Sequence, residues 1–200
     1  MNKVYCAGPL FNVKEREEMA EIAEALEKNG LKVFLPHRDG FEFANLYGVF
    51  LELGYSEIQA NIILNKTIFT LDVFQVLSSD GLVLNINGRV PDEGAMVEAG
   101  IAWNAGKKVV IYKNDSRTLI NGFDNPLLLG LGDFQIISDI QKIPDIFIEF
   151  FATIDIDSNN TIDNSCVKEL FKKGQQISLI ASKSDQKNFI CQELINLFEV

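Results

Sequence analysis

Short runs of apolar residues recur along the first two thirds of the chain. Each run is four to six residues long and borders Gly, Pro, Asn or charged residues, which is typical of strands buried on both faces of a sheet. The runs are KVYCAG (3–8), LKVFLP (31–36), GLVLNI (81–86), KVVIY (108–112) and FQII (134–137). The pattern therefore predicts five strands.

The longer segments between these runs carry apolar residues at helical spacing. In residues 14–28, Met19, Ile22 and Leu26 fall on one helical face, and Gly30 follows the expected end. Further predicted helices are residues 56–77, which contain neither Gly nor Pro, residues 92–105, which lie between Pro91 and Gly106, and IPDIFIEFFATI (143–154). The segment HRDGFEFANLYG (37–48) instead predicts a polar and aromatic loop.

Strands that alternate with helices favour a parallel sheet, because each parallel crossover must return across a face of the sheet. We therefore expect an α/β fold with a five-stranded parallel sheet between two helical layers, of the flavodoxin-like or Rossmann-like kind. This domain is expected to span residues 1–154. Residues 155–200 begin with a polar segment and continue with two helical patterns, which predicts a C-terminal helical extension packed on the domain or on another subunit.

Composition and charge exclude several classes of function. The formal net charge of -10 opposes binding to nucleic acid, which requires clustered Lys and Arg. No apolar run approaches the roughly 18 residues of a membrane span, and the N-terminus does not have the pattern of a signal peptide. Three widely spaced cysteines without a CxxC motif fit a reducing cytoplasm. The chain lacks GxGxxG, the phosphate-binding P-loop and a metal-ligand spacing, so we expect no cofactor and no metal.

Glu98 is the first candidate for chemistry, because its neighbours along the predicted helix are apolar from Ala95 to Trp103. We expect no plainly solvent-facing side on this part of the helix. Acids on helices are usually solvated, and Asp92 near the helix start has a second interpretation as a helix cap. A carboxylate among apolar residues, however, is costly to bury unless its charge is used. We therefore expect Glu98 and Asp92 to share a small cavity.

The carboxyl ends of parallel strands meet at one rim, where ligands of such sheets bind. The segments expected at this rim are Tyr5–Pro9, Pro36–Arg38, Asn85–Asp92 and Lys113–Asp115. They bring several acids and a tyrosine, with Arg38 and Arg89 as the basic side chains. The single histidine, His37, lacks the partners of a Ser-His-Asp triad.

Three motifs together resemble the nucleoside 2-deoxyribosyltransferase family. They are YCAGPLF near the start, Asp72 placed eight residues before Asp80, and PDEGAMVEAG followed by the strand GKKVVIY. The resemblance covers about residues 3–152. It implies that Glu98 is the nucleophile that attacks the sugar of a 2'-deoxynucleoside and holds it as a covalent ester until a second base accepts it.

The resemblance also implies roles for other residues. Tyr5 matches the tyrosine that orients the nucleophile, while Asp72 and Asp92 match the acids that bind the nucleobase and protonate it as it leaves. Asn125 and Leu127 match the segment by which a neighbouring subunit reaches the sugar hydroxyl, although Pro126 and Leu127 depart from the family's residues. The residues of the first loop that are expected to contact substrate are Gly8, Pro9 and Phe11.

The implied enzyme is a pentosyltransferase of nucleotide salvage, with a 2'-deoxynucleoside as donor, a nucleobase as acceptor and no cofactor. It is expected to be a cytoplasmic homo-oligomer whose subunits share active sites. One alternative is a 2'-deoxynucleoside 5'-phosphate N-hydrolase, although AGPLFNV offers no Ser or Arg for the phosphate and Asp92 stands where those enzymes carry a serine. Hydrolysis of the unphosphorylated nucleoside also remains open. The other alternative is a non-catalytic nucleoside-sensing domain on the same fold.

Overall fold

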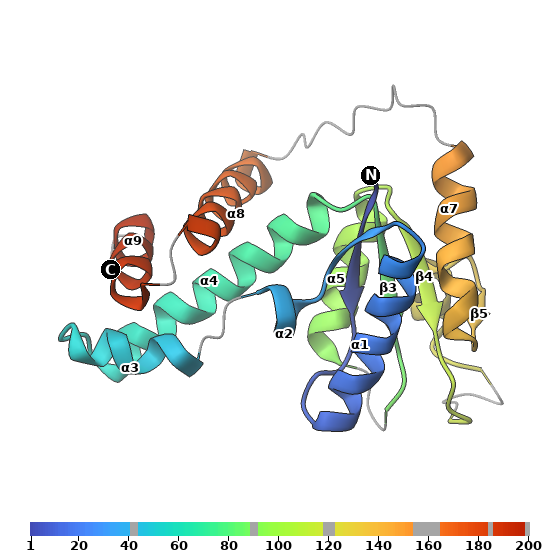
Figure 1. Cartoon of the computed structure of the whole chain (residues 1–200), viewed down its shortest axis with the longest axis horizontal. Helices are drawn as coiled ribbons and strands as arrows, with labels where there is room; N and C mark the ends of the chain where they lie inside the picture. The colour runs from blue at the N-terminus through green and yellow to red at the C-terminus, as the bar shows by residue number, and fades with distance from the viewer. Residues whose placement is uncertain (41–43, 89–91, 118–122, 154–164, 184–185, 199–200) are drawn as a thin grey trace. The chain divides into compact units, whose positions relative to one another are not determined.

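Five strands pair in parallel in the order β2-β1-β3-β4-β5 (Figure 1). Their bounds are β1 Lys3–Ala7, β2 Lys32–Phe34, β3 Gly81–Asn85, β4 Lys108–Tyr112 and β5 Ile136–Ile137. The five predicted strands are confirmed, and β2 and β5 are shorter than expected. The strand order reverses between β1 and β3, and ligands of open α/β sheets bind at such a reversal, beyond the carboxyl ends of the strands.

The computed structural model describes residues 1–40, 44–88, 92–117, 123–153, 165–183 and 186–198. They form two compact units. The sheet unit comprises Met1–Asp39 and Val76–Thr161, and the helical unit comprises Gly40–Gln75 and Ile162–Val200. None of the helices in the described ranges combines the length and the apolar character that a membrane span requires.

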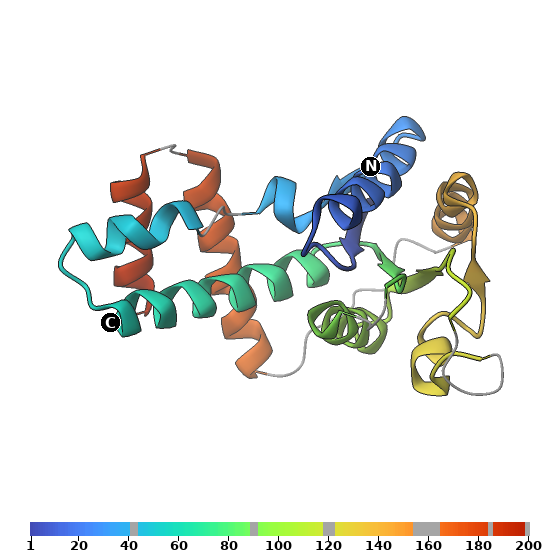
Figure 2. The same ribbon diagram turned by 90° about the horizontal axis from the view of Figure 1, so that it is seen from below.

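Helices cover both faces of the sheet (Figure 2). On one face lie α1 (Val13–Lys28) and α7 (Ile143–Thr153), which follows a short 3-10 turn at Ile140–Lys142. On the other face lie α5 (Glu93–Asn104) and α6 (Pro126–Leu131). The predicted three-layer fold is confirmed, and its strand order is the flavodoxin-like one.

Alternation along β1 decides which side chains face which layer. Val4 and Cys6 pack in the core beneath α1 and α7, whereas Tyr5 and Ala7 pack in the core beneath α5. This period of two is the normal geometry of a strand. Tyr5 is consequently fully buried and directed towards α5.

The start of α1 is fixed by a capping box. The side chain of Asn12 accepts a hydrogen bond from the backbone N–H of Glu15 at 3.0 Å, and the Glu15 carboxylate accepts one from the backbone N–H of Asn12 at 3.2 Å. From this start, Met19, Ile22 and other apolar residues recur on the buried face of the helix. The predicted helix at residues 14–28 is therefore confirmed.

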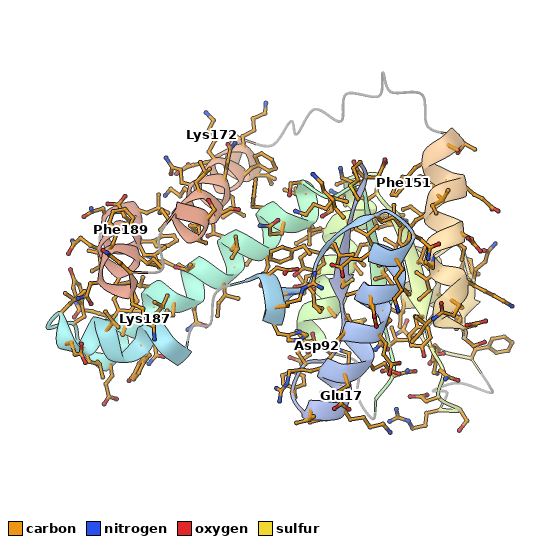
Figure 3. All side chains as sticks on the ribbon, in the orientation of Figure 1. Glu17, Asp92, Phe151, Lys172, Lys187 and Phe189 are labelled. Atoms are coloured by element: carbon orange, nitrogen blue, oxygen red, sulfur yellow. The ribbon has the colours of Figure 1, made fainter. Side chains whose placement is uncertain are left out.

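The helical unit contains α3 (Ala44–Glu52), α8 (Ser165–Lys183), α9 (Lys187–Phe198) and α4 (Glu57–Leu77) as far as Gln75. These helices share one apolar core, to which α9 contributes Ile190, Cys191, Leu194 and Ile195. Figure 3 labels Lys172 on α8 and Lys187 and Phe189 on α9. The helices predicted at residues 56–77 and within residues 166–200 are confirmed. The predicted domain boundary at residue 154 lies outside the described residues.

The predicted loop at residues 37–48 is wrong. Its first residues belong to α2 (Pro36–Asp39), and its last residues begin α3. The apolar pair with helical spacing in α3 is Leu46 and Phe50, which are four residues apart and both buried in the core of the helical unit. Phe50 lies beyond residue 48, so the segment 37–48 alone does not show this spacing. Packing against α9 therefore outweighed the weak local preference of this segment.

Gly174 on α8 gives a test of the packing inside the helical unit. A Cβ atom at Gly174 would lie 2.3 Å from Cβ of Phe74 and 2.7 Å from the backbone oxygen of Thr70, both on α4. We expect Gly174→Ala to lower the free energy of unfolding by about 1–3 kcal/mol, because the two helices must separate. Gly48→Ala is the matched control, since nothing lies within 4 Å of the added atom on α3.

Urea denaturation of both variants measures these changes. The control should match the parent protein or gain up to about 1 kcal/mol, because Ala is the better helix former. Equal stability of Gly174→Ala and the parent would contradict the close contact between α8 and α4.

Candidate active site

One face of α5 packs against the sheet through small side chains. Ala95, Ala99 and Ala102 are buried there, and they lie in the core that also contains Tyr5 and Ala7. Glu98 follows Ala95 by three residues and precedes Ala102 by four, so its side chain shares their face of the helix. The helix therefore brings a carboxylate to the same layer as the Tyr5 ring.

A hydrogen bond joins these two elements. The hydroxyl of Tyr5 donates to Oε1 of Glu98 at 2.7 Å. The Tyr5 ring is fully buried and stacks on Phe34 of β2, with 5.6 Å between ring centroids. A rigid ring holding a hydroxyl against a half-buried carboxylate fixes the direction of that carboxylate.

The outer face of α5 differs from the prediction. We expected no solvent-facing side, but Val97 and Trp103 are 59% and 56% exposed. The apolar residues of α5 therefore divide between a buried face of alanines and an exposed face. Glu98 is intermediate in exposure, on the sheet-facing side.

Asp92 is the N-cap of α5, which is the second of the two interpretations that its position in the sequence allowed. Its Oδ1 accepts a hydrogen bond from the backbone N–H of Ala95 at 2.6 Å. Figure 3 shows Asp92 at the lower end of the sheet unit, with Glu17 of α1 at the same end and Phe151 of α7 at the opposite end. Six residues of helix correspond to about 9 Å of rise, which is the axial separation between Asp92 and Glu98.

The loop that follows β1 is packed tightly at one residue and exposed at another. A Cβ atom at Gly8 would lie 2.6 Å from Sδ of Met19 and 2.8 Å from Cβ of Asn85, so only glycine fits there. Pro9 is also buried. Phe11, in contrast, is 80% exposed.

Asn125 begins α6 and accepts a hydrogen bond from the backbone N–H of Leu127 at 2.9 Å. Pro126 occupies the first turn, where its missing N–H has no cost. Leu127 is 85% exposed and Phe123 is 68% exposed. The segment thus presents apolar side chains on both sides of Asn125.

Asp72 lies on α4, within the helical unit. Burial raises the pKa of Asp72 to about 7, because desolvation penalises the charged carboxylate. This shift is the kind that functional acids show. Its place beside the substrate stays a prediction.

The basic groups expected at the rim have other partners or fall outside the described residues. Arg38 forms ion pairs with Glu27 at 2.7 Å and Asp39 at 2.8 Å, and Arg89 lies outside the described residues. Burial, together with Arg16 and Arg38, lowers the pKa of His37. In the part of the chain that is described, no three His, Cys, Asp or Glu side chains are grouped so as to hold a metal ion.

The sequence analysis placed the segment Asn85–Asp92 at the rim but missed Glu18 and the contacts that it makes there. Glu18 of α1 accepts hydrogen bonds from the side-chain amides of Asn85 and Asn87, at 2.8 Å and 2.7 Å. Two asparagines at the end of a buried strand, Asn85 as its last residue and Asn87 just beyond it, are a recognisable signal. Glu18 itself gives none, because it is one of several acids on α1.

Comparison with known proteins places these features in a family. The sequence model of the nucleoside 2-deoxyribosyltransferase family matches residues 4–168. A search of curated proteins finds no match.

Solved structures share the fold. A conserved protein from Enterococcus faecalis V583 is similar with a TM-score of 0.53 and 20% identity, over 75% of this chain and 99% of that chain. A 2-deoxyribosyltransferase from Bacillus psychrosaccharolyticus is similar with a TM-score of 0.50 and 19% identity, over 72% of this chain and 90% of that chain.

The family match runs from β1 through every strand of the sheet and includes both the Tyr5–Glu98 pair and the Asp92 cap. The structural neighbours have the same fold over nearly their whole length. This chain therefore belongs to the nucleoside 2-deoxyribosyltransferase family.

Proposed function

We propose that the protein is a nucleoside 2-deoxyribosyltransferase, which exchanges the nucleobase of a 2'-deoxynucleoside through an ester on Glu98. The observation that carries the proposal is the 2.7 Å hydrogen bond from the buried Tyr5 hydroxyl to Glu98. Family membership supports the proposed substrate class, and the hydrogen bond supports the choice of Glu98 as the nucleophile.

In the first half-reaction, an oxygen of Glu98 forms a bond to the anomeric carbon as the bond to the base nitrogen breaks. The electron pair of that bond leaves with the base, which takes a proton from an acid. Positive charge develops on the sugar, and a nearby carboxylate stabilises it before it is trapped. The Tyr5 hydroxyl keeps the carboxylate in one orientation, which lowers the entropic part of the barrier.

In the second half-reaction, a nitrogen of the acceptor base attacks the anomeric carbon and the ester bond to Glu98 breaks. The electron pair of the ester bond returns to the carboxylate. Tyr5 donates to this carboxylate and so stabilises the charge that reappears on it. The proton lost by the acceptor nitrogen returns to the acid that served in the first step, so the cycle closes.

Asp72 and Asp92 are the proposed acids at the base. Because burial raises the pKa of Asp72 to about 7, a large fraction of this side chain carries a proton near neutral pH. Asp92 is committed to the first turn of α5 through one oxygen. We assign the proton donor to Asp72 and a binding role at the base to Asp92.

A second copy of the chain is proposed to complete the site with Asn125. The support is the exposure of Leu127 and Phe123 on either side of Asn125, which gives this segment apolar surface for a second copy to cover. Gly8, Pro9 and Phe11 are proposed to line the sugar and base on the same subunit as Glu98.

Glu98→Ala tests the nucleophile. We expect transfer from a 2'-deoxynucleoside to a free base to fall by about 10³-fold or more, because no other group forms the ester. The matched control is Glu93→Ala, which removes an exposed acid from the same helix and should keep the parent rate. Equal losses in the two variants, or a fully active Glu98→Ala, would refute the assignment.

Tyr5→Phe tests the orienting hydrogen bond. The ring remains in the core, but the hydroxyl that donates to Glu98 is gone. A hydrogen bond to a charged group contributes about 1.5–3 kcal/mol, so kcat should fall about 10- to 100-fold. Steady-state kinetics with a 2'-deoxynucleoside and a base decide the matter: an unchanged kcat would show that Glu98 needs no help from Tyr5.

The pH dependence of kcat/KM tests Asp72. Its folded pKa is raised to about 7, so the proton is present below that pH and is lost as the pH rises through it. We expect kcat/KM to fall above pH about 7, by about tenfold per pH unit. Asp72→Asn should have a lower kcat/KM that no longer falls above pH about 7. Asp145→Asn, at an exposed acid of α7, should retain this fall. The same fall of kcat/KM in Asp72→Asn would contradict the role of Asp72 as proton donor.

A further inference from the structure

The carboxylate of Glu18 bridges α1 and the segment that leaves β3. It accepts from Nδ2 of Asn85 at 2.8 Å and from Nδ2 of Asn87 at 2.7 Å. We infer that these three residues, the Glu18 clamp, position the loop that carries Asp92 and the loop that carries Gly8. The expected effect of the clamp on kcat rests on the proposed function, whereas its expected effect on the rigidity of the backbone does not.

Asn85 has no alternative arrangement within the clamp. It is fully buried at the end of β3, and its side-chain oxygen accepts from the backbone N–H of Asn87 at 2.9 Å. Its amide nitrogen donates to Glu18 and also lies 3.5 Å from the sulfur of Met19. Oxygen and nitrogen of this amide therefore both have partners, and exchanging them would leave buried groups unpaired.

Asn87 connects Glu18 to the loop after β4 through its side-chain amide. Its side-chain oxygen accepts from the backbone N–H of Asn114 at 2.8 Å, while its amide nitrogen is held by Glu18. The next residue, Gly88, donates its backbone N–H to Asp115 at 3.0 Å. The chain leaving β3 is thus held from α1 on one side and from the segment after β4 on the other.

The clamp reaches the proposed site through two short links. Four peptide steps lead from Gly88 to Asp92, which limits their separation to about 15 Å. The second link is the contact of Gly8 with Asn85 and Met19, where a Cβ atom would not fit. Gly8 follows β1 and Gly88 follows β3, the two strands between which the strand order reverses.

A polar cavity of about 460 Å³ borders Glu18, Asn87 and Asp115. Glu18 is bonded to Asn85 and Asn87, and Asp115 is bonded to Gly88 and Arg117. These groups already satisfy one another, so the contacts describe a scaffold that holds two loops. Glu18 is accordingly a positioning residue for the proposed reaction.

The clamp can be tested by swapping the carboxylate of Glu18 and the amide of Asn87 between the two positions. In Glu18→Gln, one end of the new amide is a donor and faces the donor nitrogen of Asn85 or Asn87. In Asn87→Asp, a carboxylate faces the carboxylate of Glu18. In the double variant Glu18→Gln with Asn87→Asp, the Gln nitrogen donates to Asp and its oxygen accepts from Asn85, so complementarity returns. The Asp oxygens also still accept from the backbone N–H of Asn114.

The first measurement is base exchange by the full chain at a temperature well below its melting point. We expect each single variant to lose about 10- to 100-fold in kcat with a smaller change in KM, because a displaced loop misaligns bound substrate. The double variant should return to within about threefold of the parent. Glu17→Gln, an exposed neighbour on α1, makes the same change of charge and should leave kcat unchanged (Figure 3).

The second measurement is amide hydrogen exchange at Gly88 and Asn114 by nuclear magnetic resonance, which needs no activity. Exchange should accelerate in the single variants and return to the parent rate in the double variant. Parent-like kcat and exchange in Glu18→Gln, or no recovery in the double variant, would overturn the inference. If a single variant fails to fold, recovery in the double variant still decides. A parent protein without transfer activity would refute the proposed function alone, and amide exchange would then judge the clamp.

Discussion

The contact between Tyr5 and Glu98 sets the requirements that the sheet unit has to meet. A hydroxyl on β1 can reach a carboxylate on α5 only if Tyr5 faces that helix and the helix lies close to the sheet. The alternation along β1 meets the first requirement. The small side chains of Ala95, Ala99 and Ala102 meet the second, because larger residues would lift α5 away from the strands.

The two faces of the sheet differ in the polar contacts that they hold. The α5 face holds the carboxylate proposed to react, in a layer of small apolar residues. The α1 face holds the polar contacts of Glu18, Asn85 and Asn87, which fix the backbone that leaves β3. The proposed nucleophile and the Glu18 clamp thus lie on opposite faces of the sheet. Close packing of Gly8 against Met19 and Asn85 holds the loop after β1 on the face of the clamp.

Much of the fold was predictable because its signals are local. Buried strands and the helices between them follow from apolar runs and from helical spacing, and the Tyr5, Glu98 and Asp92 assignments followed from motifs within single segments. The helix at Leu46 and Phe50 was not predictable, since it is stabilised by packing in an apolar core shared with segments far along the chain, including α9. The same limit applies to Glu18, whose role depends on two asparagines more than 60 residues away, as their separations of 67 and 69 residues show.

The most direct test of the central claim is to locate the sugar on the protein. The parent enzyme is mixed with a 2'-deoxynucleoside without an acceptor, quenched in acid, digested, and its peptides are sequenced by mass spectrometry. The account predicts one deoxyribosyl group per subunit, attached to Glu98 on α5. A deoxyribosyl group attached to Asp72 or Asp92, or turnover without any attached sugar, would contradict it.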